Sequence, residues 1–89
     1  MIDKKEWEKL YKWAYEYSKK ITLSGNMEEC WRIDIYIDEN TYFFIDKNGN
    51  ITVHKYFYNT TVDFTILKNR TPQQIKSIIK NLVDEANND

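Results

Sequence analysis

The sequence is poor in the residues that most disulfide, metal and phosphate sites require. It has one cysteine, one histidine, one proline and two glycines among 89 residues. A lone Cys30 excludes an internal disulfide and fits a reducing compartment. One histidine and one cysteine cannot make a zinc site of recognised spacing, and there is no glycine pattern for a phosphate or a dinucleotide. We therefore expect no metal and no cofactor.

Neither sign of charge predominates. Thirteen Lys and Arg residues stand against 14 Asp and Glu residues, for a formal net charge of −1. This balance gives no global field to attract nucleic acid or an anionic membrane. The longest apolar runs are too short to span a bilayer, and the first residues lack the apolar segment of a signal peptide. We therefore expect a cytoplasmic protein with no membrane role.

Apolar and aromatic residues, by contrast, are ample. Hydrophobic residues make up 42% of the sequence and aromatic residues 16%, so we expect a folded chain rather than a disordered one. At this length we expect one domain, residues 1–89, that buries roughly 60–65% of its unfolded surface. Ile, Lys, Asn and Tyr have AT-rich codons, and their heavy use indicates a low-GC bacterium, or a phage or mobile element living in one.

The middle of the chain has the pattern of an antiparallel meander. From Trp31 to Asp38 apolar and polar side chains alternate strictly, as in a half-buried strand. Further runs of β-branched and aromatic residues follow it. The expected strands span residues 30–38, 41–46, 51–58 and 62–67.

Asn48-Gly49 predicts the hairpin between the second and third of these strands, but it permits two registers. A type I turn with Gly49 in the left-handed conformation pairs Ile45 with Ile51, whereas a two-residue loop pairs Ile45 with Thr52. Because a shift of one residue exchanges the two faces of a strand, the apolar pattern selects the first register. The buried face should then contain Trp31, Ile33, Ile35, Ile37, Phe43, Ile45, Ile51 and Val53.

The neighbouring hairpins follow from the same reasoning. A turn at residues 38–40 pairs Ile35 with Phe43. Three side chains of the last strand should also point inward: Val62, Phe64 and Ile66. Lys55 would then lie awkwardly among inward positions, unless this edge strand contains a bulge.

Helices are predicted on both sides of the meander. Asp3 is a candidate N-cap, and an apolar stripe extends the first helix over residues 3–21. Thr71-Pro72 begins a second amphipathic helix over residues 72–86. The order α-β-β-β-(β)-α predicts an α+β fold, a two-layer sandwich in which both helices cover one face of an antiparallel meander sheet.

The other face of the sheet should be open, and it is rich in aromatic residues. Exposed patches of this kind usually mark an interface, and Tyr and Arg are common interface anchors. The alternative is that cross-strand aromatic pairs only stabilise the sheet. The candidate protein-binding residues are Arg32, Asp34, Tyr36, Tyr42, Phe44, His54, Tyr56 and Tyr58. Two such faces packed together would make a homodimer.

Candidates for catalysis are few. His54 could have Asp34 or Asp63 near it on the open face, but no pattern supplies a nucleophile. Cys30 follows Glu28 and Glu29, whose charges disfavour a thiolate. We therefore assign no catalytic residue and expect a protein that is not an enzyme.

The expected element order resembles that of the double-stranded-RNA-binding domain. In that family the first helix and a lysine-rich start of the second helix contact the RNA backbone. Here Lys76 and Lys80 stand where the family has a dense basic cluster. The resemblance implies nucleic-acid binding, and aromatic residues of the open face could also stack on bases.

Size, balanced charge and the aromatic face favour a small, non-enzymatic protein-binding module. The compositional bias extends this hypothesis to an inhibitor encoded by a phage or mobile element, which blocks a bacterial defence protein in the manner of an anti-CRISPR protein. A nucleic-acid-binding module and a homodimeric bacterial protein are the alternatives.

Overall fold

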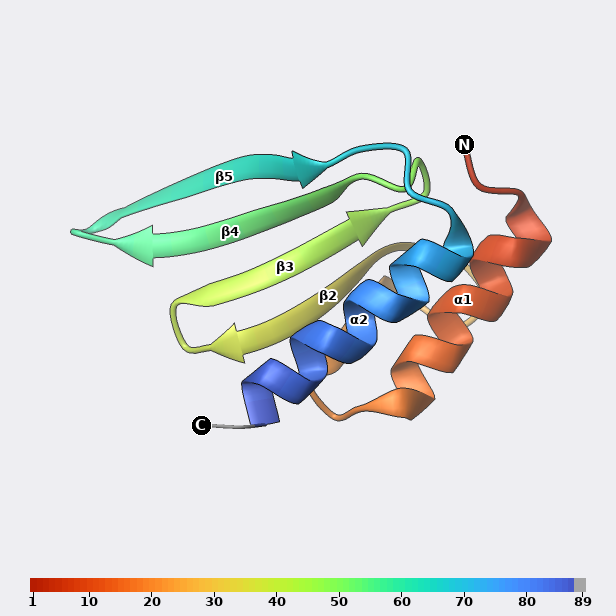
Figure 1. Ribbon diagram of the computed structural model, residues 1–89, viewed down its shortest axis with the longest axis horizontal. Coiled ribbons are helices and arrows are strands. Elements are labelled where there is room, and N and C mark those ends of the chain that lie inside the picture. Colours follow the sequence, from red (N-terminus) through yellow and green to blue (C-terminus); the bar gives the residue numbers. More distant parts are fainter. Residues whose placement is uncertain (88–89) are drawn as a thin grey trace.

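The computed structural model describes residues 1–87, which form two helices and a five-stranded sheet. The helices are α1 (Lys4–Tyr17) and α2 (Pro72–Asn87). The strands are β1 (Ile21–Gly25), β2 (Cys30–Asp38), β3 (Thr41–Asp46), β4 (Ile51–Phe57) and β5 (Thr60–Leu67). Each strand is antiparallel to its neighbours, and the order in the sheet follows the chain from β1 to β5. Both helices cover the same face of the sheet (Figure 1).

The predicted α+β meander with both helices on one face is confirmed. The strands expected over residues 30–38 and 41–46 coincide with β2 and β3. β4 ends at Phe57 rather than at residue 58, and β5 begins at Thr60 rather than at residue 62. α2 extends to Asn87.

The prediction of a first helix over residues 3–21 is wrong at its end. α1 stops at Tyr17, Ser18 adopts an extended backbone, and its Oγ accepts a hydrogen bond from the Lys20 amide at 3.1 Å. The chain then forms β1, in which Ile21 pairs with Ile35. Ile21 fitted the helical stripe because both arrangements bury it. The order α-β-β-β-β-β-α thus contains more strands than the double-stranded-RNA-binding domain that the expected order resembled.

The hairpin turn before β4 has the predicted geometry. Gly49 has a φ of +78°, and its amide donates to the Asp46 carbonyl at 3.0 Å. An added Cβ on Gly49 would lie 2.3 Å from the Arg70 carbonyl oxygen, because the turn packs against the segment that leads into α2. The predicted registers are confirmed, with Ile45 opposite Ile51, Phe43 opposite Val53 and Ile35 opposite Phe43.

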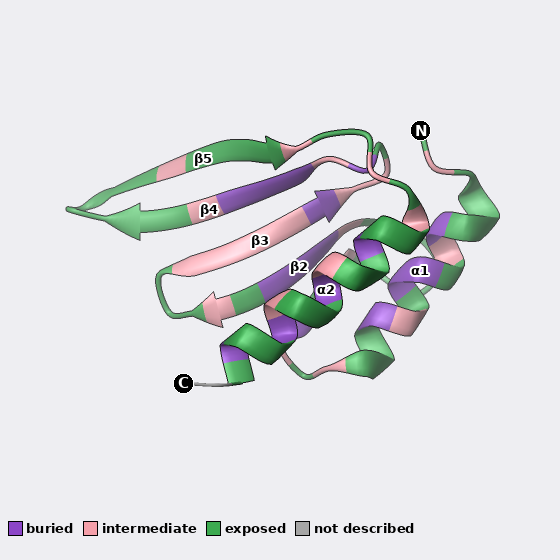
Figure 2. Ribbon diagram, in the orientation of Figure 1, coloured by how far each residue is buried: buried purple, intermediate pink, exposed green. Residues whose placement is uncertain are grey.

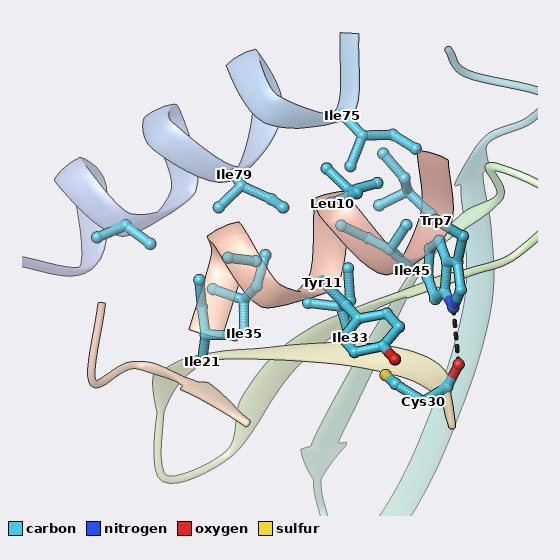
Figure 3. Close-up of a cluster of buried hydrophobic side chains, with 13 residues drawn as sticks. Trp7, Leu10, Tyr11, Ile21, Cys30, Ile33, Ile35, Ile45, Ile75 and Ile79 are labelled. Carbon is cyan, nitrogen blue, oxygen red and sulfur yellow. Dashed lines mark hydrogen bonds between the residues drawn. The ribbon is translucent and has the colours of Figure 1, made fainter. Parts of the chain in front are cut away.

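The core lies between the helices and the sheet (Figure 3). Figure 3 labels ten of its side chains, and those of Ile33, Ile35, Ile45, Ile75 and Ile79 are completely buried. Trp7 Nε1 donates to the Cys30 carbonyl at 2.7 Å, so the indole of α1 is satisfied inside the core. No helix among residues 1–87 is long and apolar enough to cross a membrane.

The prediction that Trp31 is buried is wrong. Ser24 pairs with Arg32 and Gly25 with Cys30, so Trp31 is the extra residue of a bulge in β2. The bulge turns Cys30 into the core and leaves Trp31 54% exposed. The other predicted members of the buried face are buried, or in the case of Ile37 and Phe43 partly buried against the core.

The inward positions of β5 are also not buried as predicted. Phe64 lies opposite Val53 on the helix side of the sheet, yet it is 53% exposed, and Ile66 is 47% exposed. In the described part of the chain the helices approach β1 and β2 but not β4 or β5. Figure 2 shows most of β5 exposed. Lys55 lies opposite Val62 on the helix side of the sheet, and it is exposed to solvent there. β5 does contain a bulge, at Ile66, but the bulge is too far along the strand to turn Lys55 away from this side.

Candidate protein-binding face

The open face is the side of the sheet that points away from the helices. The register places seven of the eight predicted side chains on it: Arg32, Asp34, Tyr36, Tyr42, Phe44, His54 and Tyr56. Cross-strand pairing brings Asp34 opposite Phe44, and aligns Tyr36, Tyr42 and His54 in one row across three strands. The strands thus gather these residues into one surface, and their role in binding stays a prediction.

An ion pair between half-buried Arg32 and buried Asp34 lies at the β2 end of this surface. The Asp34 carboxylate accepts from Arg32 Nε at 2.7 Å and from Arg32 Nη2 at 3.2 Å, and the Ser24 hydroxyl donates to it at 3.2 Å. Asp34 is only 4% exposed. A carboxylate removed from water on a sheet face without a helix requires such partners, since an unpaired buried charge is costly.

Aromatic rings surround the Arg32 guanidinium. Its central carbon lies 4.5 Å from the ring centroid of Phe44, 5.1 Å from that of Trp31 and 5.9 Å from that of Tyr42. Burial lowers the pKa of Arg32, but hydrogen bonds and charge from Asp34 outweigh it and raise the pKa overall. Arg32 is therefore a fixed cation whose flat group is held against aromatic surfaces.

A second polar contact lies at the β5 end of the open face. His54 Nδ1 hydrogen-bonds the Asp63 carboxylate, and the His54 ring stacks on Tyr42 with centroids 4.6 Å apart. Tyr36, at the β2 end of the same row, packs against Tyr42 with ring centroids 5.3 Å apart. The hydrogen bond fixes the orientation of the imidazole. From β2 to β5 the face is thus a continuous array of aromatic and charged groups held by its own contacts.

The rim of the array protrudes into solvent. Tyr36 is 42% exposed and Tyr56 is 45% exposed, whereas Tyr42 and Phe44 are half-buried between their neighbours. Trp31, which sequence reasoning placed in the core, joins this rim through the β2 bulge. The bulge arises because three residues of β2, Cys30–Arg32, lie opposite only two of β1, Ser24 and Gly25. The alternating pattern of β2 gave no signal of it.

Tyr58 is not part of the open face. Tyr58 and Asn59 have φ values of +50° and +61°, so they form the two-residue turn between β4 and β5. Tyr58 is 91% exposed at the tip of the hairpin. The prediction that it continues β4 is wrong because Phe57 pairs with Thr60 and closes the strand first.

The described residues gather no group of three or more His, Cys, Asp or Glu side chains that could hold a metal ion. Of the two acids predicted near His54, Asp63 contacts it, while Asp34 is engaged by Arg32. Burial raises the pKa of the Cys30 thiol, which keeps it protonated and a poor nucleophile.

The two lysines considered for nucleic acid lie against the other helix. Lys76 Nζ is 5.3 Å and Lys80 Nζ 5.9 Å from the ring centroid of Trp13. Both ammonium groups thus bridge α2 to α1 by cation–π contact. A cleft of about 470 Å³ opens near the start of α1. Its lining includes Lys4 and Lys47 but also Glu8 and Glu28, so it carries charges of both signs rather than a basic surface for nucleic acid.

No protein-family model, curated protein or solved structure matches the chain. Its function is therefore inferred from the open face itself.

Proposed function

We propose that this chain is a small protein-binding module whose open face contacts another protein. One observation carries the proposal. A partly buried Arg32–Asp34 pair lies among aromatic rings, beside a rim of exposed aromatic side chains, on a sheet face that no helix of residues 1–87 covers. The proposed contact residues are Trp31, Arg32, Asp34, Tyr36, Tyr42, Phe44, His54 and Tyr56.

The composition of this face suits protein recognition. Trp, Tyr and Arg are the residues that most often dominate binding energy at protein interfaces. Their stacking within the face restricts their rotamers before any partner arrives, which reduces the entropy lost on binding. A nucleic-acid partner is less well served, since Asp34 and Asp63 lie on the same surface as Arg32 and His54.

A more specific proposal, about the origin and target of the protein, rests on its amino-acid composition. The AT-rich codon bias supports a phage- or mobile-element-encoded inhibitor, which acts in the bacterial cytoplasm and blocks a defence protein, such as a CRISPR effector, by contact alone. Neither catalysis nor a cofactor enters this proposal.

Alanine substitutions separate binding from folding. We expect Tyr36→Ala and Tyr56→Ala to lower the free energy of unfolding by about 1 kcal/mol or less. Tyr36→Ala removes one cross-strand aromatic contact, with Tyr42, and Tyr56→Ala removes an exposed hydrogen bond from its hydroxyl to the Asn59 side chain. The same variants should lose capture of the target protein from nuclease-treated lysate. Tyr15→Ala on α1, where the side chain is 52% exposed, is the matched control and should keep both properties.

Unfolding by denaturant and quantitative mass spectrometry of the captured proteins give the two readouts. A loss of stability that accounts for the loss of capture would reduce Tyr36 and Tyr56 to sheet-stabilising residues. Capture that disappears for the unmodified chain after nuclease treatment would assign the face to nucleic acid instead.

A further inference from the structure

The free edge of β5 is the second surface that the fold leaves without a partner. Within residues 1–87 β5 is the last strand of the sheet and pairs only with β4. It is eight residues long, and Asp63 is its one charged side chain. Long edge strands with few charges are templates for pairing with another chain. β1, at the opposite edge, has only five residues, so it offers a shorter template than β5, which is regular from Thr60 to Thr65 and bulges at Ile66.

The hydrogen-bonding pattern shows which backbone groups β5 presents. The Asp46 amide bonds the Asn50 carbonyl, and the Tyr56 amide bonds the Asn40 carbonyl. The even-numbered residues of β4 therefore bond toward β3 and the odd-numbered ones toward β5. Because Val53 faces Phe64 and Lys55 faces Val62, the backbone groups directed outward belong to the odd-numbered residues of β5. These residues are Thr61, Asp63 and Thr65.

We propose that β5 pairs antiparallel with β5 of a second copy of this chain, in the register that places Phe64 opposite Phe64 across a two-fold axis. In this register Phe64 occupies a non-hydrogen-bonded pair, in which the facing side chains are closest. Val62 then lies opposite Ile66 of the other copy, at the point where β5 bulges against β4. The half-exposed apolar side chains of β5 would thus be joined into one apolar row.

Charge distinguishes this register from the neighbouring one that is centred on Asp63. Shifting the pairing by one residue on each strand would set Asp63 directly against Asp63, which is destabilising. With Phe64 on the axis, Asp63 instead faces Thr65 of the other copy. The Thr65 hydroxyl lies 3.1 Å from the Thr52 hydroxyl, and by accepting from Thr52 it keeps its own proton to donate to the Asp63 carboxylate. Both requirements, apolar against apolar and acid against hydroxyl, are met by the sequence of a single strand.

The geometry also sets the arrangement of the two open faces. A two-fold axis perpendicular to the sheet keeps the same face of both copies on the same side. The dimer would therefore present two open faces side by side on one continuous sheet. An edge contact of this length is smaller than a standard interface, so we expect association that depends on concentration between about 10 and 500 µM.

Disulfide trapping tests the register. Phe64→Cys should cross-link to itself under mild oxidation, because facing Cα atoms of a non-hydrogen-bonded pair are about 4.5 Å apart. Val62→Cys is the matched control on the same strand and face. Its two copies would be displaced by four residues, or about 13 Å, which exceeds the reach of a disulfide. The buried Cys30 is common to both variants.

We expect Phe64→Cys to form dimer at least about tenfold faster than Val62→Cys, since only its thiols meet within disulfide distance. Sedimentation velocity of the unmodified chain provides a measurement that depends on no variant, and it should show a dimer at the high end of the concentration range. Equal cross-linking of the two variants, or a chain that stays monomeric throughout, would overturn the proposal. A monomer would leave the β5 edge to a strand of a different protein.

Discussion

At the scale of residues, the open face depends on one polar contact that sequence patterns do not reveal. Asp34 occupies an outward position of an alternating strand, where a solvated side chain is expected, yet Arg32, Ser24 and the surrounding rings bury it. Alternation of apolar and polar residues identified the face correctly. It could not show that a charged side chain on that face lies under its neighbours, because much of this burial comes from the adjacent strands β1 and β3.

Removing the Arg32 guanidinium should therefore lower the stability of the whole fold as well as disrupt the arrangement of the open face. We expect Arg32→Ala to lower the free energy of unfolding by about 3 kcal/mol, because it leaves the Asp34 carboxylate buried without its cation. Lys55→Ala, which removes a solvated cation from β4, is the control and should change stability by less than about 0.5 kcal/mol. Chemical denaturation checks both values. If the two variants are equally stable, the ion pair does not organise the face.

At the scale of elements, the turns and bulges decide which side chains reach the open face. The Gly49 turn fixes the register of β3 on β4, and the β2 bulge sends Trp31 outward. The sequence identified the first device because Asn-Gly is specific to a turn type. It did not reveal the second, nor β1, because five residues after a helical stripe carry too little periodicity to distinguish a strand from a continued helix.

Substitution of Gly49 tests directly whether this turn sets the register of β3 on β4. Gly49→Ala should destabilise the protein by at least about 2 kcal/mol, since alanine disfavours a positive φ and its Cβ would collide with the Arg70 carbonyl. Asn48→Ala, one position earlier in the same turn, should have a small effect because only the Asn48 backbone amide is engaged. Thermal unfolding compares them. Equal melting temperatures would mean that the turn relaxes and that the predicted register does not depend on it.

At the scale of the whole molecule, the helices protect one half of the sheet and leave the other half available. α1 and α2 pack over β1 and β2, so the core is concentrated there, while most of β5 and the second half of β4 are exposed (Figure 2). The fold class followed from element order and apolar stripes. The position of the helix layer along the sheet did not, because it depends on tertiary contacts such as Trp13 with Lys76.

Site-specific photocross-linking would test most directly the claim that the open face contacts another protein. A photoreactive benzoylphenylalanine would replace Tyr56 on the open face or Tyr15 on α1, two positions of similar exposure. Each chain would then be irradiated in lysate of the organism that encodes it. We predict a protein adduct of defined mass at position 56, insensitive to nuclease, and none at position 15. The same adducts at both positions, or none at position 56, would contradict the claim.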